Sequence, residues 1–243
     1  MPETLAFTRL LNHLFGGAVA AVLQALGVHP ANAAAPIDDT FAMELLVVAI
    51  LLVFFIAVRL SLDVEKPNPL QHLAEGIHEF VAEQGESIVG HDFERFLGFI
   101  TVLGLFILLC NLLGLVPGLK SPTADVVVPF GCAVLTFLYY HYYGIRKNGW
   151  RYIKQFLGPV WWLAPLMFVI EIISHLARVL SLTVRLFANI FAGDMVTLAF
   201  FSLVPVFVPL IFLGLHVFVS VLQAYLFMAL ALSYLSLAVA EEH

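Results

Sequence analysis

The sequence predicts an all-α integral membrane protein with about five membrane helices. Hydrophobic residues make up 62% of the 243 residues and charged residues only 12%, against roughly 25% charged residues in an ordinary soluble domain. Five mainly apolar stretches reach the length of about 18 residues that a spanning helix needs. They cover residues 43–62, 96–116, 126–143, 163–202 and 206–239. We therefore expect residues 37–243 to form a single membrane domain, with no separate soluble domain.

The first 36 residues form an N-terminal extension for which the sequence leaves two alternatives. Arg9, the apolar stretch 14–28 and the triplet Ala31-Asn32-Ala33 imitate a secretory signal with its cleavage site. Polar residues weaken that interpretation: Glu3, His13, Gln24 and His29. The alternative is an interfacial or extra-membrane helix. Both alternatives place the N-terminus of the mature chain outside.

Basic residues predict the orientation, because cytoplasmic loops retain lysine and arginine. With an external N-terminus, only Arg9 and Lys120 lie outside, and Arg178 and Arg185 lie within the membrane. The remaining basic residues then lie inside: Arg59, Lys66, Arg95, Arg146, Lys147, Arg151 and Lys154. We therefore expect the C-terminus to be cytoplasmic.

The segment 63–94 is predicted to contain an acidic, amphipathic surface helix. It carries eight carboxylates and a single lysine. Leu70, Leu73, Ile77 and Val81 recur at helical spacing, away from most of these carboxylates. A protein partner, the lipid headgroups and plain solvation of the polar face all remain open as explanations.

Residues 117–122 contain two prolines and a glycine, which predict a turn between the second and third apolar stretches. Asn111, just before this turn, is interpreted as an amide that bonds a neighbouring helix. Cys110 and Cys132 fall within predicted spans and are interpreted as small buried hydrophobic residues, not as a disulfide or metal pair. The sequence predicts no metal, no cofactor and no binding of nucleic acid.

The last two apolar stretches are much longer than a membrane is thick. The tract 166–204 lacks proline, and 205–209 is its one strong break. Two helices of well over 30 residues would be about 50 to 60 Å long, against a hydrocarbon core of about 30 Å. Because both are apolar along almost their whole length, we expect a steeply tilted hairpin.

Polar residues of the first long helix share one face. Glu171, His175, Arg178, Arg185 and Asn189 are separated by three, four or seven residues, which keeps them on one side of a helix.

The second long helix repeats this spacing with His216, Ser220 and Gln223. A turn centred near Val204 would place Arg185 level with Gln223. It would also bring Asp194 within a turn of His216.

This arrangement predicts two half-paths for protons, separated by a fixed charge. Asp194 with His216 lies toward the outside and Glu171 with His175 toward the inside, and carboxylates and imidazoles exchange protons near neutral pH. Arg185 cannot release its proton, so it would block a simple channel. Two separated half-paths make sense if a moving carrier takes a proton from one and delivers it to the other. The alternative for any single pair is an intramembrane ion pair that holds the hairpin together.

At these residues the chain resembles subunit a of the F-type ATP synthases, a likeness that covers roughly residues 40–243. The segments that carry the resemblance are Ser181 to Asp194 (SLTVRLFANIFAGD), His216, Leu222 to Met228 (LQAYLFM), Tyr234 to Ser236 and Asn111 to Pro117.

The resemblance implies a role for each matching residue. Arg185 would be the stator arginine that faces the carboxylates of a rotating c-ring, with Gln223 beside it. Asp194 and His216 would belong to the external half-channel, and Glu171 with Ser174 to the internal one. The remaining residues expected on the proton path are His175, Ser181 and Asn189.

The implied protein is a proton-translocating stator subunit with no active site of its own, located in a bacterial inner membrane. Its implied partners are an oligomeric c-ring, the peripheral stalk subunit b and the lipid bilayer, and its transported ion is the proton. The competing function is a self-contained ion channel or secondary transporter. That function predicts inverted repeats or broken mid-membrane helices, and the sequence shows neither.

Overall fold

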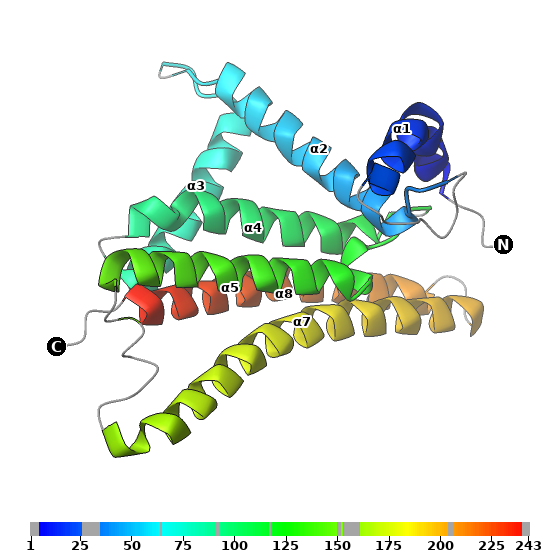
Figure 1. Cartoon of the computed structure of the whole chain (residues 1–243). Coiled ribbons are helices and arrows are strands. Elements are labelled where there is room, and N and C mark those ends of the chain that lie inside the picture. Colours follow the sequence, from blue (N-terminus) through cyan, green and yellow to red (C-terminus); the bar gives the residue numbers. More distant parts are fainter. Residues whose placement is uncertain are drawn as a thin grey trace.

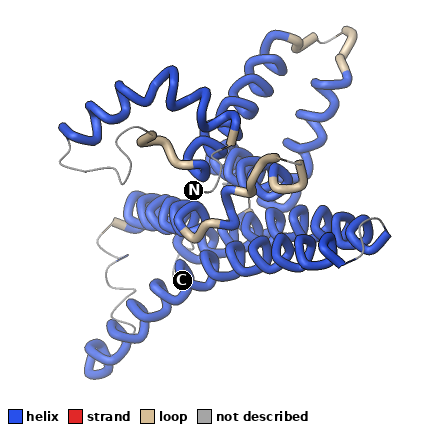
Figure 2. The backbone as a smooth tube through the Cα atoms, turned by 90° about the vertical axis from the view of Figure 1, so that its right-hand side faces the viewer, coloured by secondary structure: helices blue, strands red, loops and turns tan. Residues whose placement is uncertain are grey.

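The computed structural model describes residues 5–25, 35–63, 65–90, 93–116, 118–149, 152, 161–203 and 207–239. These residues form helices joined by turns, without a strand among them (Figure 2). The helices are α1 (Ala6–Ala25), α2 (Asp39–Leu60), α3 (Pro69–Val89), α4 (Glu94–Leu113), α5 (Val127–Asn148), α7 (Ala164–Leu203) and α8 (Phe207–Val239), with short 3-10 helices η2 (Pro122–Ala124) and η3 (Trp161–Leu163). The predicted all-α membrane class is confirmed.

Four helices in the described part of the chain are long and apolar enough to cross a membrane: residues 39–60, 94–113, 164–200 and 210–239. α5 begins apolar but ends in a segment rich in tyrosine and basic residues, which lowers its hydropathy. It still runs beside α4 and packs against α7 and α8 (Figure 1). The predicted spans match α2, α4, α5, α7 and α8, with ends that differ by a few residues.

The core of the bundle lies where α4, α5 and α8 meet (Figure 1). Phe96 and Ile100 of α4 pack there with Phe227 and Leu232 of α8, and all four side chains are buried. The two cysteines are buried and free, as predicted. α2 leans away from this core, and α1 packs on the first part of α2.

The two long helices have the predicted lengths. α7 contains 40 residues and α8 contains 33, which gives about 60 Å and about 50 Å of helix. The second half of α7 lies alongside α8, whereas its first half curves away from the bundle (Figure 1). The connection at 204–206, with the predicted turn centre at Val204, lies outside the described residues.

α3 is the predicted amphipathic helix, and its second half packs against the core. Val81 is buried and Ile77 packs against the core, whereas Leu73 is 56% exposed. α3 contacts α4 and α8 through this second half, where Gly85 lies directly against the ring of Phe93. Leu73 thus belongs to the exposed part of the apolar face of this surface helix.

Replacing Gly85 by alanine is expected to destabilise the protein by about 1 to 3 kcal/mol, the usual cost of overpacking a filled site. A Cβ atom at Gly85 would overlap the ring of Phe93, which is buried and has no free space to enter. The measurement is thermal unfolding in detergent. Gly76→Ala on the same helix is the control, since a Cβ there meets nothing within 4 Å. Equal stability of the two variants would contradict this prediction.

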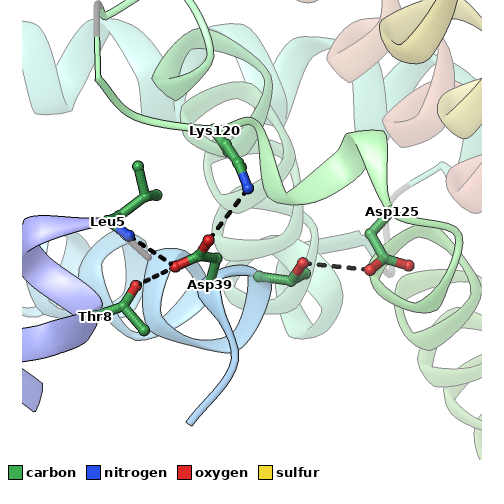
Figure 3. A network of polar contacts seen from close by, with 6 residues as sticks. Leu5, Thr8, Asp39, Lys120 and Asp125 are labelled. Carbon is green, nitrogen blue, oxygen red and sulfur yellow. Dashed lines mark hydrogen bonds and ion pairs between the residues drawn. The ribbon is translucent and has the colours of Figure 1, made fainter. Parts of the chain in front are cut away.

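Helix α1 is tied to α2 by a polar network around Asp39 (Figure 3). The Asp39 carboxylate accepts hydrogen bonds from the Thr8 hydroxyl at 2.7 Å and the Leu5 N–H at 3.2 Å, and it pairs with Lys120 at 3.1 Å. Asn12 exchanges two hydrogen bonds with the backbone of Ile37. Residues 6–25 thus form a helix that packs on α2, and its place relative to the membrane stays a prediction. The Ala31-Asn32-Ala33 triplet lies outside the described residues.

Candidate functional site

Expected site residues of α7 and α8 meet along the hairpin, and Asp194 lies beside His216, as predicted. The Asn189 amide donates a hydrogen bond of 2.9 Å to the Gln223 side-chain oxygen. Gln223 is therefore within side-chain reach of Asn189, one turn from Arg185, and the predicted level pairing of Gln223 with Arg185 stays a prediction. Buried residues such as Leu186 and Ile190 set this register through their packing, whereas the position of the helix break fixes it only roughly.

Arg185 lies at the edge of an outward-facing strip of α7. Its guanidinium lies 3.5 Å from the Ser181 hydroxyl, one turn away on the same helix. Val184 and Ala188 beside it are exposed, whereas Leu182 and Leu186 on the opposite side are buried against the bundle. Among the described residues no carboxylate pairs with this cation. Arg185 thus presents a positive charge along an outward-facing surface of α7.

Asp194 and His216 come together on the side of Arg185 that leads to the α7–α8 connection. An Asp194 carboxylate oxygen lies 3.6 Å from His216 Nδ1, slightly beyond hydrogen-bond distance. Gly193 makes this approach feasible, because a Cβ there would stand only 3.1 Å from the same nitrogen. His216 is buried and Asp194 is partly exposed. The pair therefore connects a buried imidazole with a more accessible carboxylate.

Buried polar groups continue from His216 toward the turn before α5. His216 Nε2 and the Ser220 hydroxyl are buried and make no hydrogen bond to any described residue. The Asn111 amide donates to the Ser220 backbone oxygen at 3.3 Å, which confirms that Asn111 bonds a neighbouring helix. Asn111 in turn accepts a 2.6 Å hydrogen bond from Thr123 of η2. Thr123 was not predicted as part of the site, because its only sequence signal is that of a turn residue.

Glu171 and His175 form a second pair, toward the first half of α7. His175 Nε2 lies 3.3 Å from a Glu171 carboxylate oxygen, and His175 Nδ1 lies 2.9 Å from the Tyr140 hydroxyl of α5. Both residues line a cavity of about 150 Å³, together with Tyr140, Tyr152, Arg178, Tyr234, Leu237 and Ala238. Ser174 is half-buried and does not line this cavity.

Three tyrosines and one arginine of this cavity were missed as site residues. The Arg178 guanidinium sits 5.2 Å from the centre of the Tyr234 ring, within the range of a cation–π contact. Tyr140 and Tyr152 come from other parts of the chain, so no helical spacing links them to Glu171. Arg178 and Tyr234 do lie on the expected polar faces of α7 and α8, so helical spacing could have identified these two as site residues.

The site thus contains one cation on an exposed face, with a carboxylate and an imidazole on each side of it along the hairpin. At 1.5 Å per residue, Asp194 stands about 14 Å from Arg185 along α7, and Glu171 stands about 21 Å away in the other direction. Carboxylates and imidazoles exchange protons readily, whereas a guanidinium does not. The arrangement can take up a proton at either end of the hairpin, but Arg185 interrupts a continuous path between the ends.

Comparison with known proteins gives the family. The family model described as ATP synthase A chain matches residues 41–236. The chain is 54% identical to ATP synthase subunit a of Koribacter versatilis over 100% of both chains. It is 46% identical to ATP synthase subunit a of Solibacter usitatus, over 96% of this chain and 100% of the relative. For ATP synthase subunit a of Geobacter sulfurreducens the identity is 41%, over 82% and 86%. This membrane protein belongs to the ATP synthase A chain family and is a membrane-sector subunit of an F-type ATP synthase.

Proposed function

We propose that this protein translocates protons as the stator subunit of the synthase, with Arg185 facing the carboxylates of a rotating c-ring. The observation that carries the proposal is the position of Arg185. A central arginine costs about 2.5 to 3.5 kcal/mol on membrane-insertion scales, so it persists where it meets a partner or water. Arg185 lies on an outward-facing strip and has no carboxylate partner among the described residues. An acidic group on a neighbouring subunit would supply that partner.

The two acid–imidazole pairs supply the half-channels in this proposal. Asp194 and His216 would load a c-ring carboxylate with a proton from outside, and Glu171 with His175 would receive the proton that leaves on the inside. Asn189 and Gln223 bond each other beside Arg185 and would keep polar groups available where the carboxylate passes. Ser181 contacts Arg185 directly, and Ser174 lies near the internal pair.

Rotation is gated by charge in this mechanism. A nearby cation favours the ionised form of a carboxylate, so a protonated c-ring carboxylate that reaches Arg185 gives up its proton to the internal half-channel. An ionised carboxylate is costly in hydrocarbon, so it must be reprotonated from the external half-channel before it returns to lipid. The proton gradient thereby determines the direction of rotation.

The proposed setting follows from the same assignment. We place the protein in a bacterial inner membrane, with its N-terminus outside and its C-terminus in the cytoplasm. Its partners would be the c-ring, which passes Arg185, and the peripheral stalk subunit b, which would hold this subunit still. The distribution of basic residues supports this orientation.

The test is purification of the complex through a tag on this chain, followed by reconstitution into vesicles. We expect the c-ring and subunit b to co-purify, and ATP hydrolysis by the whole complex to acidify the vesicle interior. This protein reconstituted alone should not conduct protons, because Arg185 separates the half-channels. Proton conduction by the isolated chain would favour the self-contained channel instead and would contradict the proposal.

A further inference from the structure

We propose that Tyr140, His175 and Glu171 form a proton relay that connects the cavity beside Arg178 with the surface of α7. Such a relay presupposes the proposed proton translocation and adds to it a residue of α5. The three side chains come from two helices that pack against each other, α5 and α7. The His175 ring links the other two, since one of its nitrogens contacts Tyr140 and the other contacts Glu171.

The geometry places His175 between a hydroxyl and a carboxylate. Its Nδ1 lies 2.9 Å from the Tyr140 oxygen, and its Nε2 lies 3.3 Å from a Glu171 oxygen. A neutral imidazole has one donor nitrogen and one acceptor nitrogen. With both nitrogens occupied, the ring can accept a proton on one side while it releases another on the opposite side.

The burial of the three groups gives the relay two distinct ends. Tyr140 is 2% exposed, whereas the Glu171 side chain is 36% exposed. All three residues line the cavity of about 150 Å³, which has room for several water molecules, since each occupies about 30 Å³ in the liquid. The relay therefore runs from a buried hydroxyl at the cavity to a carboxylate that reaches the surface.

Charged and titratable groups surround His175 on every element that lines the cavity. α5 contributes Tyr140 and the neighbouring His141, α7 contributes Glu171 and Arg178, and α8 contributes Tyr234. Tyr152, which lies between α5 and α7 in the sequence, also lines the cavity. Arg178 opposes a second positive charge at His175, whereas Glu171 favours one. Because these effects oppose each other, His175 is suited to pass a proton on and not to store it.

Each proton transfer in the relay has a defined donor and acceptor. With Glu171 ionised, the Tyr140 hydroxyl donates to Nδ1, and the Nε2–H points to Glu171. The Nε2 proton moves to Glu171, the Tyr140 proton moves to Nδ1, and the Tyr140 oxygen takes a proton from a hydronium ion that has entered the cavity, which leaves a water molecule there. Glu171 then releases its proton to the solution, and the ring recovers its first tautomer by exchange with cavity water. One proton has crossed from the cavity to the surface, and no tyrosinate forms.

The alternative is that the bond between Tyr140 and His175 only holds α5 against α7. The test measures passive proton flux through vesicles that contain this subunit with its c-ring and stalk, driven by a potassium diffusion potential. Tyr140→Phe keeps the ring and removes the hydroxyl, and we expect a loss of flux of about a hundredfold or more, the usual range for a lost proton-transfer group. Tyr139→Phe is the matched control, since Tyr139 stacks on Phe99 and does not line the cavity.

His175 separates the relay from a structural bridge. His175→Gln retains a donor and an acceptor but cannot exchange tautomers, so we expect a similar loss of flux in complexes that contain a normal amount of c-ring. Added imidazole should restore flux to His175→Ala, whereas pyrazole, a ring of equal size but much lower basicity, should not. Full flux in both Tyr140→Phe and His175→Gln would overturn the relay and leave the proposed function standing. Absence of flux in the unaltered complex would instead overturn the proposed function.

Discussion

Replacing Arg185 by alanine is expected to abolish ATP-driven proton pumping while the complex still assembles. Loss of the guanidinium removes the charge that would drive a c-ring carboxylate to release its proton. Each 1.4 kcal/mol of lost stabilisation costs about tenfold in rate, and an ionised carboxylate in hydrocarbon costs several times that amount. We therefore expect a loss of at least about a hundredfold. Assembly should be spared, because the side chain lies at an exposed edge and, within the described part of the chain, bonds only Ser181.

The measurement is acidification of vesicles after addition of ATP, at equal amounts of co-purified c-ring. Arg185→Lys keeps the charge but loses the planar, multidentate guanidinium, so we expect severe impairment there as well. Arg59→Ala is the control, since Arg59 is an exposed cation in the last turn of α2. Normal pumping by an assembled Arg185→Ala complex would refute the gating role of this charge.

Replacing His216 by alanine is expected to slow proton conduction by about 10²-fold or more, the effect typical of a lost acid–base group. His216 is the buried partner of Asp194, at 3.6 Å, and its second nitrogen has no hydrogen-bond partner among the described residues. Without the imidazole, no titratable group in the described part of α8 would carry a proton from Asp194 toward Gln223. The barrier at Arg185 should remain intact, so the variant should not leak protons.

The informative measurement for His216 is proton flux against external pH. His216→Gln preserves most of the buried volume and should lose flux like His216→Ala, which distinguishes lost chemistry from a packing defect. His78→Ala, at an exposed histidine of α3, is the control. The exchange of Asp194→His with His216→Asp should restore part of the flux, because the same two groups remain together. An unchanged rate and pH profile in His216→Ala would remove this residue from the path and direct attention to Ser220.

The sequence predicted the parts of the fold that depend on one helix at a time. Apolar length identified the spans, and prolines near 117–122 and 205–209 identified the breaks. Helical spacing placed Glu171, His175, Arg178, Arg185 and Asn189 on one face of α7. These predictions succeeded because hydrophobicity and the 3.6-residue repeat are local properties of the chain.

The tertiary structure decided how those helices meet. Gln223 bonds Asn189, one turn from Arg185, because the packing of buried side chains decides which polar groups of a hairpin meet. Tyr140 joins His175 across 35 positions of sequence, and Thr123 joins Asn111 from a turn. No periodicity within one helix encodes such contacts, since they arise only when separate helices pack in three dimensions. The sequence by itself therefore determined the membrane class, the family resemblance and the polar face, whereas packing determined which groups that face would touch.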